Sequence, residues 1–183
     1  MKLKMSIITI LALILSACSA INVNTNTDTS ANFGSFHTFN FAPIKPNPQA
    51  PFAFSQINQN RIKDAITHEM KMRNYQLAEK PDIKIGFYLS VKDETDVYGT
   101  GGGYWGYDYG PVQTYHYTAG TLIIDLVDTK NNKLIWQGLA KGILPQGSNY
   151  SEEKVQKVIT KVFEHYNYLA GDSQPVATKV SKK

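Results

Sequence analysis

Residues 120–140 read GTLIIDLVDTKNNKLIWQGLA, and this stretch decides the fold. Every second residue on either side of residues 128–133 belongs to one expected strand face. These residues are Leu122, Ile124 and Leu126 before the segment, and Leu134, Trp136, Gly138 and Ala140 after it. A period of two residues is typical of β-strands. Residues 128–133 (DTKNNK) predict a tight turn, because Asn tolerates the left-handed backbone conformation. We therefore expect an antiparallel hairpin whose strands cover about 115–127 and 134–143.

Three more elements are expected upstream of this hairpin. The aromatic stretch at 36–41 predicts a short strand, and a proline-rich loop follows it. Ser55 can cap a helix that runs to about Arg73. The buried stripe of this helix consists of apolar residues at helical spacing, Ile62, Ala65, Ile66 and Met70. Residues 82–91 alternate between apolar and polar side chains, which predicts a half-buried strand.

The last expected element is an amphipathic helix with Glu152 and Glu153 in its first turn, where carboxylates suit the helix dipole. Its apolar stripe consists of Val155, Val158, Ile159, Val162, Phe163 and Tyr166. The element order is thus β-α-β-β-β-α. A three-stranded antiparallel meander must cover its apolar face, and the two helices carry matching stripes. We therefore expect one α+β domain over residues 31–170, a two-layer sandwich with both helices packed on one face of an antiparallel sheet.

Composition excludes several classes of protein. The chain has 183 residues, 42% hydrophobic and 19% charged, which fits one domain. A net charge of +4 without a dense Lys/Arg patch is too mild for a nucleic-acid binder. The single Cys excludes an intrachain disulfide and a zinc cluster built from cysteine.

The first 17 residues predict a signal peptide. Lys2 and Lys4 supply the positive start, and the stretch from Ile7 to Leu15 is apolar except for Thr9. This apolar stretch is too short to cross a bilayer, because a spanning helix needs about 20 residues. We therefore expect the segment to be removed from the mature protein.

The signal ends in Leu15-Ser16-Ala17-Cys18, the lipobox pattern of bacterial lipoproteins. Small residues suit the signal peptidase, and the Cys18 thiol can take a diacylglycerol thioether. The alternative is a buried thiol behind an ordinary signal or a short membrane anchor. We expect cleavage between Ala17 and Cys18 and stable attachment through acyl chains such as palmitate on Cys18. Ser19 in place of Asp permits transfer to the outer membrane of a Gram-negative cell, with the domain facing the periplasm.

Two polar segments flank the expected domain. Residues 18–30 are rich in Asn and Thr, have no apolar period, and predict a flexible tether. Residues 171–183 are polar and end in lysine, which predicts a disordered tail.

Three segments resemble the bacterial lipoprotein family known as domain of unknown function 4136. Residues 31–41 resemble its opening strand, and residues 120–128 resemble its central strand. Residues 134–138 (LIWQG) resemble the strand that follows, with Gln137 in place of the commoner Arg. The resemblance covers about residues 27–168. It implies a lipoprotein with an α+β domain, no established activity and no catalytic residues to carry over.

An aromatic, glycine-rich stretch at 98–117 differs from the rest of the chain. It holds six of the 11 Tyr and six of the 13 Gly. Tyr104, Trp105, Tyr107 and Tyr109 are candidate contacts for a glycan such as peptidoglycan, a bilayer surface or a protein partner. The alternative is a flexible loop without a ligand. The glycines are not a phosphate loop, because no Gly-Lys-Ser/Thr follows them.

Candidate catalytic and metal-ligating residues are sparse. Asp93, Glu94 and Asp96 could serve acid–base or calcium chemistry near His116, but such a cluster entering a loop is usually a solvated edge. The histidines are spread over different expected elements, at His37, His68, His116 and His165. We therefore expect no metal, no cofactor and no catalytic site. The favoured hypothesis is a non-enzymatic envelope lipoprotein that works through interaction, and the alternative is a glycan-binding module.

Overall fold

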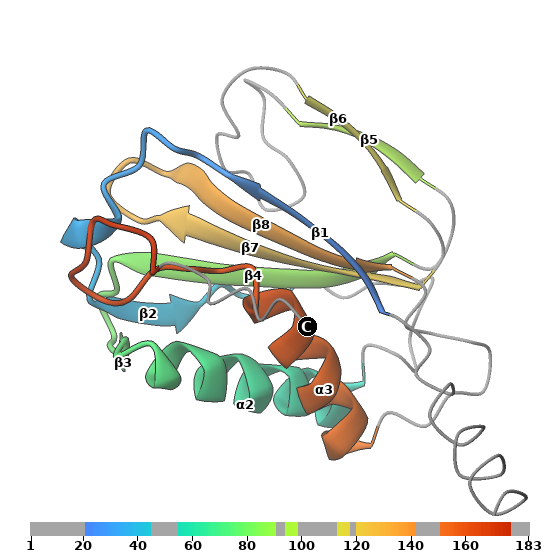
Figure 1. The fold of residues 1–183 in the computed structure, drawn as a ribbon. Coiled ribbons are helices and arrows are strands. Elements are labelled where there is room, and N and C mark those ends of the chain that lie inside the picture. Colours follow the sequence, from blue (N-terminus) through green and yellow to red (C-terminus); the bar gives the residue numbers. More distant parts are fainter. Residues whose placement is uncertain are drawn as a thin grey trace, which may run out of the picture.

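A six-stranded sheet is covered on one face by two helices, and a separate hairpin lies on its other side (Figure 1). The computed structural model describes residues 21–44, 55–90, 94–98, 113–117, 120–141 and 151–176. The sheet strands are β1 (Asn22–Thr27), β2 (Thr38–Phe41), β3 (Gln76–Leu77), β4 (Ile83–Ser90), β7 (Thr121–Asp128) and β8 (Lys133–Lys141). The hairpin consists of β5 (Glu94–Tyr98) and β6 (Gln113–Tyr117). The helical segments are α2 (Gln56–Met72), α3 (Glu152–Phe163) and the short 3-10 helix η2 (Phe33–Ser35).

The expected α+β architecture is confirmed, and so is the hairpin at its centre. β7 and β8 pair antiparallel, with Leu122 opposite Ala140 and Leu126 opposite Trp136, so these side chains share one face of the sheet. A register shift after Leu126 then places Leu134 opposite Val127. The turn between the strands contains Asn132 at φ 52°, the left-handed conformation expected there. The strand order is β1-β8-β7-β4-β2-β3, which leaves β7 in the middle of the sheet.

Two strands differ from the sequence-based expectation. The single strand expected over 115–127 is divided between β6 and β7, which belong to different sheets. The sheet is also mixed, since β2 runs parallel to β4, with Phe39 opposite Ile83. The physical reason is the connection, because α2 carries the chain back to the end of the sheet from which β2 started.

The flexible tether expected at 18–30 is a wrong prediction for residues 21–30, the part of it that the structure describes. Residues 22–27 form β1, which pairs antiparallel with β8 along its whole length. Ile21 and Val23 pack partly against the core. The Asn and Thr side chains of β1 are mostly exposed, which explains why no apolar period marks the strand. An edge strand of this kind is held by backbone pairing, and polar side chains suit its open edge.

The tail expected to be disordered from residue 171 is also partly ordered. Residues 171–176 lie against the domain, where the Gly171 N–H donates to the Phe36 carbonyl at 3.0 Å. Gly171 has φ 76°, a conformation that favours glycine. Residues 177–183 lie outside the described part of the chain.

The core lies between the sheet and the two helices. Its largest fully buried side chains include Trp136, Tyr75, Tyr166, Phe39, Phe87 and Phe163. The Trp136 ring lies 5.6 Å from that of Phe163 and 5.3 Å from that of Tyr166, measured between ring centroids. Complete burial of one such side chain stabilises the fold by roughly 1.5–3 kcal/mol. These aromatic contacts therefore hold β8 against the C-terminal end of α3.

The face of the sheet away from the helices is buried as well. Tyr88 of β4 is 4% exposed, and all eight residues of β7 are buried. Successive side chains of a strand point to opposite faces, so β7 is covered on both sides. The sequence predicts that one face of the strand at 82–91 is exposed. That prediction is wrong, because side chains on this face are also buried. The positions read as polar there include Gly86 and Tyr88, which carry no charge and tolerate burial.

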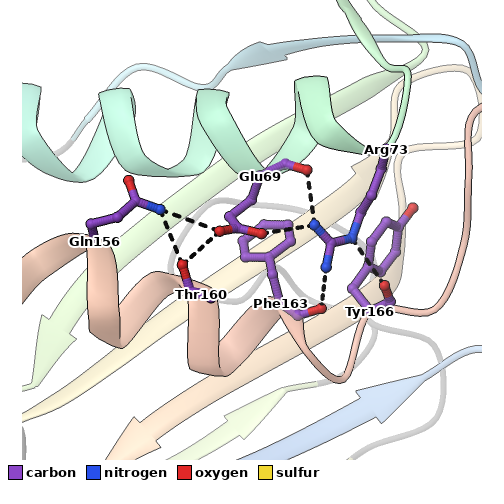
Figure 2. A network of polar contacts seen from close by, with 6 residues as sticks. All are labelled: Glu69, Arg73, Gln156, Thr160, Phe163 and Tyr166. Carbon is purple, nitrogen blue, oxygen red and sulfur yellow. Dashed lines mark hydrogen bonds and ion pairs between the residues drawn. The ribbon is translucent and has the colours of Figure 1, made fainter. Parts of the chain in front are cut away.

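α2 and α3 are joined by a network of polar contacts around Arg73 (Figure 2). The Arg73 guanidinium donates from Nη2 to the Phe163 carbonyl at 2.7 Å and from Nε to the Tyr166 carbonyl at 3.1 Å. Its Nη1 lies 2.8 Å from Glu69 Oε2. The other Glu69 oxygen accepts a hydrogen bond from the Thr160 hydroxyl at 2.7 Å. Arg73 thus connects the end of α2 to the end of α3.

Both helix starts are capped by serine. The Ser55 hydroxyl accepts from the Asn58 N–H, as the sequence predicts, and the Ser151 hydroxyl accepts from the Lys154 N–H. α3 begins at Glu152, with Glu152 and Glu153 in its first turn as expected, and ends at Phe163, before the last residue of the expected apolar stripe, Tyr166.

Gly138→Ala should lower the free energy of unfolding by about 2 kcal/mol, because overpacking of a filled core is destabilising. A Cβ at Gly138 would lie 2.5 Å from Val162 Cγ1 and 2.5 Å from the Trp136 ring. Urea unfolding of the purified protein measures the loss. A double variant with Val162→Ala removes one of the two clashes, so a favourable coupling energy is expected between the substitutions. An unchanged midpoint for Gly138→Ala would contradict the close approach of β8 and α3.

Arg73→Lys should lower the free energy of unfolding by about 2 kcal/mol, because lysine cannot reproduce the forked set of hydrogen bonds. The matched control is Arg61→Lys, since Arg61 is the only other arginine and is half-buried on the same helix. The control should change stability by less than about 0.5 kcal/mol. Equal losses in the two variants, measured by urea unfolding, would show that Arg73 has no special role.

Candidate functional site

A polar pocket of about 830 Å³ lies at one end of the sheet. It is formed by the chain after β1, by η2, by the turn between β7 and β8, and by the residues before β4. Its charged lining residues are Asp28, Asp82, Asp128, Lys130 and Lys133. Carboxylates and ammonium groups thus lie together in one concave surface.

Asp82 joins the start of β4 to the start of β2. Its Oδ2 accepts hydrogen bonds from the His37 N–H at 2.9 Å, the Thr38 N–H at 2.9 Å and the Thr38 hydroxyl at 2.8 Å. The Asp82 N–H donates in return to Thr38 Oγ1 at 2.9 Å. Burial raises the pKa of Asp82, but the hydrogen bonds from His37 and Thr38 outweigh it and lower the pKa below its ordinary value. The Asp82 carboxylate is therefore ionised at neutral pH.

Asp28 ends β1 and ties it to the start of β8. Its Oδ1 accepts from the Ser30 N–H at 2.9 Å and the Ser30 hydroxyl at 2.6 Å, and Lys133 Nζ lies 2.6 Å from Oδ2. Burial raises the pKa of Asp28, and the bonds from Lys133 and Ser30 lower it by more. This carboxylate also remains ionised at neutral pH.

Asp128 closes the turn between β7 and β8. Its Oδ1 accepts from the N–H groups of Lys130 and Asn131, at 2.9 and 3.2 Å, and its Oδ2 accepts from Asn131 Nδ2 at 2.6 Å. Each carboxylate of the pocket thus holds its own turn or strand start. As ionised acceptors with their donors in place, Asp28 and Asp82 are suited to fixing loops rather than to donating a proton.

A second polar feature lies inside the sheet, on the face away from the helices. Gly138 faces Val162 of α3, so the preceding Gln137 points to the opposite face. Gln137 Nε2 donates to Asp125 Oδ1 at 2.8 Å, and neither residue is exposed. Gln137 Oε1 has no hydrogen-bond partner in the described part of the structure. Buried polar atoms are nearly always paired, so this oxygen is an exception among the described residues, beside a buried carboxylate.

Several residues singled out by the sequence lie outside the described residues. They are the lipobox residues Leu15, Ser16, Ala17 and Cys18, the aromatic residues Tyr104, Trp105, Tyr107 and Tyr109, and Asp93. Their expected roles in lipidation and partner contact therefore stay predictions, and so does the glycan-binding alternative.

The remaining acidic candidates lie on the separate hairpin. Glu94 and Asp96 belong to β5, and His116 of β6 lies opposite Thr95, between the register positions of the two acids. The other histidines, His37, His68 and His165, are exposed on different segments. Across the described ranges, no group of three or more His, Cys, Asp or Glu side chains is placed to hold a metal ion. Nor is any described helix long and apolar enough to cross a membrane.

Sequence reasoning missed the pocket, although part of its signal is visible in the chain. Asp28 is followed two residues later by Ser30, a pattern in which an aspartate accepts hydrogen bonds from the next turn. Asp128 begins the stretch identified as a turn. These two turns meet because β1 pairs with β8. The polar sequence of β1 gives no sign of this pairing.

The sequence model of the family "Domain of unknown function (DUF4136)" matches residues 23–166. The chain belongs to this family. The family match begins inside β1, so the DUF4136 domain starts earlier than the expected boundary at residue 31. Among curated proteins, none matches the chain significantly.

Two solved structures share the fold of this DUF4136 domain. A DUF4136 family protein from Bacteroides thetaiotaomicron VPI-5482 is 20% identical, with a TM-score of 0.56 and coverage of 83% of this chain and 98% of that chain. A PDZ domain protein from Parabacteroides distasonis ATCC 8503 is 14% identical, with a TM-score of 0.52 and coverage of 81% of this chain and 36% of that chain. At these identities the likeness concerns the fold alone.

Asp82→Asn should lower the free energy of unfolding at neutral pH by about 2 kcal/mol, because the amide replaces a charged acceptor of three hydrogen bonds. The folded-state pKa of Asp82 is lowered, so its contribution is present above the unfolded value of about 3.9 and is lost as pH falls through the folded value. The difference between variant and wild type should therefore shrink in acid. Urea unfolding at several pH values measures it.

The control for this prediction is Asp64→Asn, on the exposed side of α2. It should change stability by less than about 0.5 kcal/mol throughout. A deficit in Asp82→Asn that stays constant from neutral pH to strong acid would contradict the assignment of the charge.

Proposed function

We propose that this DUF4136 protein is a lipid-anchored protein of the bacterial cell envelope whose domain acts through non-enzymatic interaction. The observation that carries the proposal is the lipobox at residues 15–18, in register with the charged start and the apolar segment before it. The only cysteine of the chain stands at the one position that lipidation requires. Two or more acyl chains on Cys18 would make the attachment stable.

The geometry of the pocket supports the non-enzymatic part of the proposal. The carboxylates of Asp28, Asp82 and Asp128 are bound by donors from their own turns and neighbouring strand starts. A general acid or base needs a free proton-transferring group within reach of a substrate. These carboxylates serve instead to shape a fixed polar surface, which suits recognition of a partner.

Cys18→Ala should abolish incorporation of an alkyne fatty acid into the protein and release the domain from the membrane fraction, because the side chain that takes the lipid is gone. In-gel detection of the labelled fatty acid in growing cells, with immunoblotting of membrane and soluble fractions, measures both effects.

The matched control is Ser19→Asp, which leaves the lipobox intact. It should take up the label like the wild type, and separation of the two membranes should show a shift from outer to inner membrane. Equal fatty-acid labelling of wild type and Cys18→Ala would overturn the anchor.

A further inference from the structure

Very little chain separates the proposed anchor from the folded domain. Ile21 already packs against the hydrophobic core, and β1 begins at the next residue, Asn22. An extended chain covers at most about 3.6 Å per residue, so the three steps from Cys18 to Ile21 span at most about 11 Å. An acyl group on Cys18 would thus bring the start of β1 close to the lipid surface.

We propose, resting on the proposed acylation of Cys18, that the domain stands end-on on the bilayer. The anchor end of the domain, defined by Asn22 of β1 and Lys141 of β8, faces the lipid. The pocket end, defined by Asp28 and the turn between β7 and β8, faces away from it.

β1 is the rigid link between these two ends. Six consecutive residue pairs join it to β8, from Asn22 with Lys141 to Thr27 with Trp136. Beyond them, the Asp28 N–H donates to the Ile135 carbonyl at 2.9 Å, and Asp28 forms the ion pair with Lys133. The start of β1 cannot move away from the sheet without breaking this ladder. The anchor therefore positions the whole sheet rather than a loose terminus.

The short link excludes two other orientations. If the helix layer lay against the bilayer, the sheet would be roughly 15 Å from the lipid surface. That is the approximate distance from a sheet to the outer surface of a packed helix 10–12 Å in diameter. Such a separation exceeds the reach of three residues. With the opposite edge of the sheet, at β3, against the bilayer, β1 would be separated from the lipid by five strand spacings of about 4.8 Å each.

Contact through the outer edge of β1 is a third alternative. Backbone N–H and C=O groups on the outer side of an edge strand are ordinarily satisfied by water. Pressing them against lipid would remove that water without supplying new partners. An end-on arrangement leaves the edge hydrated and lets the chain continue in line with the strand. The pocket is then held about 27 Å from the anchor end, the length of nine residues of β8.

The test uses two exposed positions at opposite ends of α2, Gln56 and Met72. Met72 precedes β3, whose Gln76 lies opposite Thr38 near the pocket end, and Figure 1 shows the start of α2 at the other end of the sheet. The positions are 16 residues apart, about 24 Å along the helix. Because acylation blocks Cys18, a cysteine introduced at either position is the only free thiol, and a fluorophore can be attached to it alone.

Mature lipidated Gln56→Cys and Met72→Cys proteins are labelled and placed in vesicles of phosphatidylethanolamine and phosphatidylglycerol that carry a nitroxide on the lipid headgroup. The Gln56 label should lose most of its fluorescence, whereas the Met72 label should keep most of its own. As a control, a flexible 12-residue Gly/Ser insertion between Ala20 and Ile21 should abolish this difference, because such a linker spans about 20 Å.

Equal quenching at the two positions, or stronger quenching at Met72, would overturn the end-on orientation. Mass spectrometry of the same samples separates this failure from that of the proposed function. An acylated Cys18 with equal quenching overturns the orientation alone, whereas an unmodified Cys18 overturns both.

Discussion

The packing of the two helices against each other depends on the hydrogen bonds and ion pair made by the guanidinium of Arg73. It supplies positive charge at the C-terminal ends of both α2 and α3, where the unpaired carbonyls make a cation favourable. Glu69 balances this charge from within α2 and bonds Thr160 of α3. The Arg73 carbonyl also accepts from the Ala170 N–H at 2.9 Å, which holds the chain after α3 in place. Arg73 thus fixes the helix pair through its side chain and the path of the C-terminal segment through its backbone carbonyl.

The parts of the fold that could be predicted from the sequence are those with an apolar period. The β7–β8 hairpin, β4 and both helices bury a regular stripe against the core, and their residues therefore show it. β1 is different, because it pairs through its backbone and leaves most of its side chains in water. Its place beside β8 is set by long-range pairing that no local pattern encodes. The parallel pairing of β2 has the same origin.

The candidate site was harder to predict than the fold. Each pocket carboxylate lies in a short polar segment, and polar segments normally suggest loops without further role. What joins them is the meeting of Asp28 with Lys133 across β1 and β8, and of Asp82 with Thr38 across β4 and β2. The buried pair of Asp125 and Gln137 was hidden for another reason. Its two polar residues lie within strands whose apolar positions dominate the pattern.

The pairing of β1 with β8 also has a mechanical consequence. Cross-strand hydrogen bonds in an antiparallel pair lie perpendicular to the strands. A pull on the N-terminus directed along β1 therefore loads all six residue pairs together in shear, instead of opening them one at a time from the end. A strand loaded in shear withstands a larger pulling force than a strand of the same length whose hydrogen bonds open one after another. An anchor at Cys18 would transmit force into β8, the neighbour of the central strand β7, as shear along a row of hydrogen bonds.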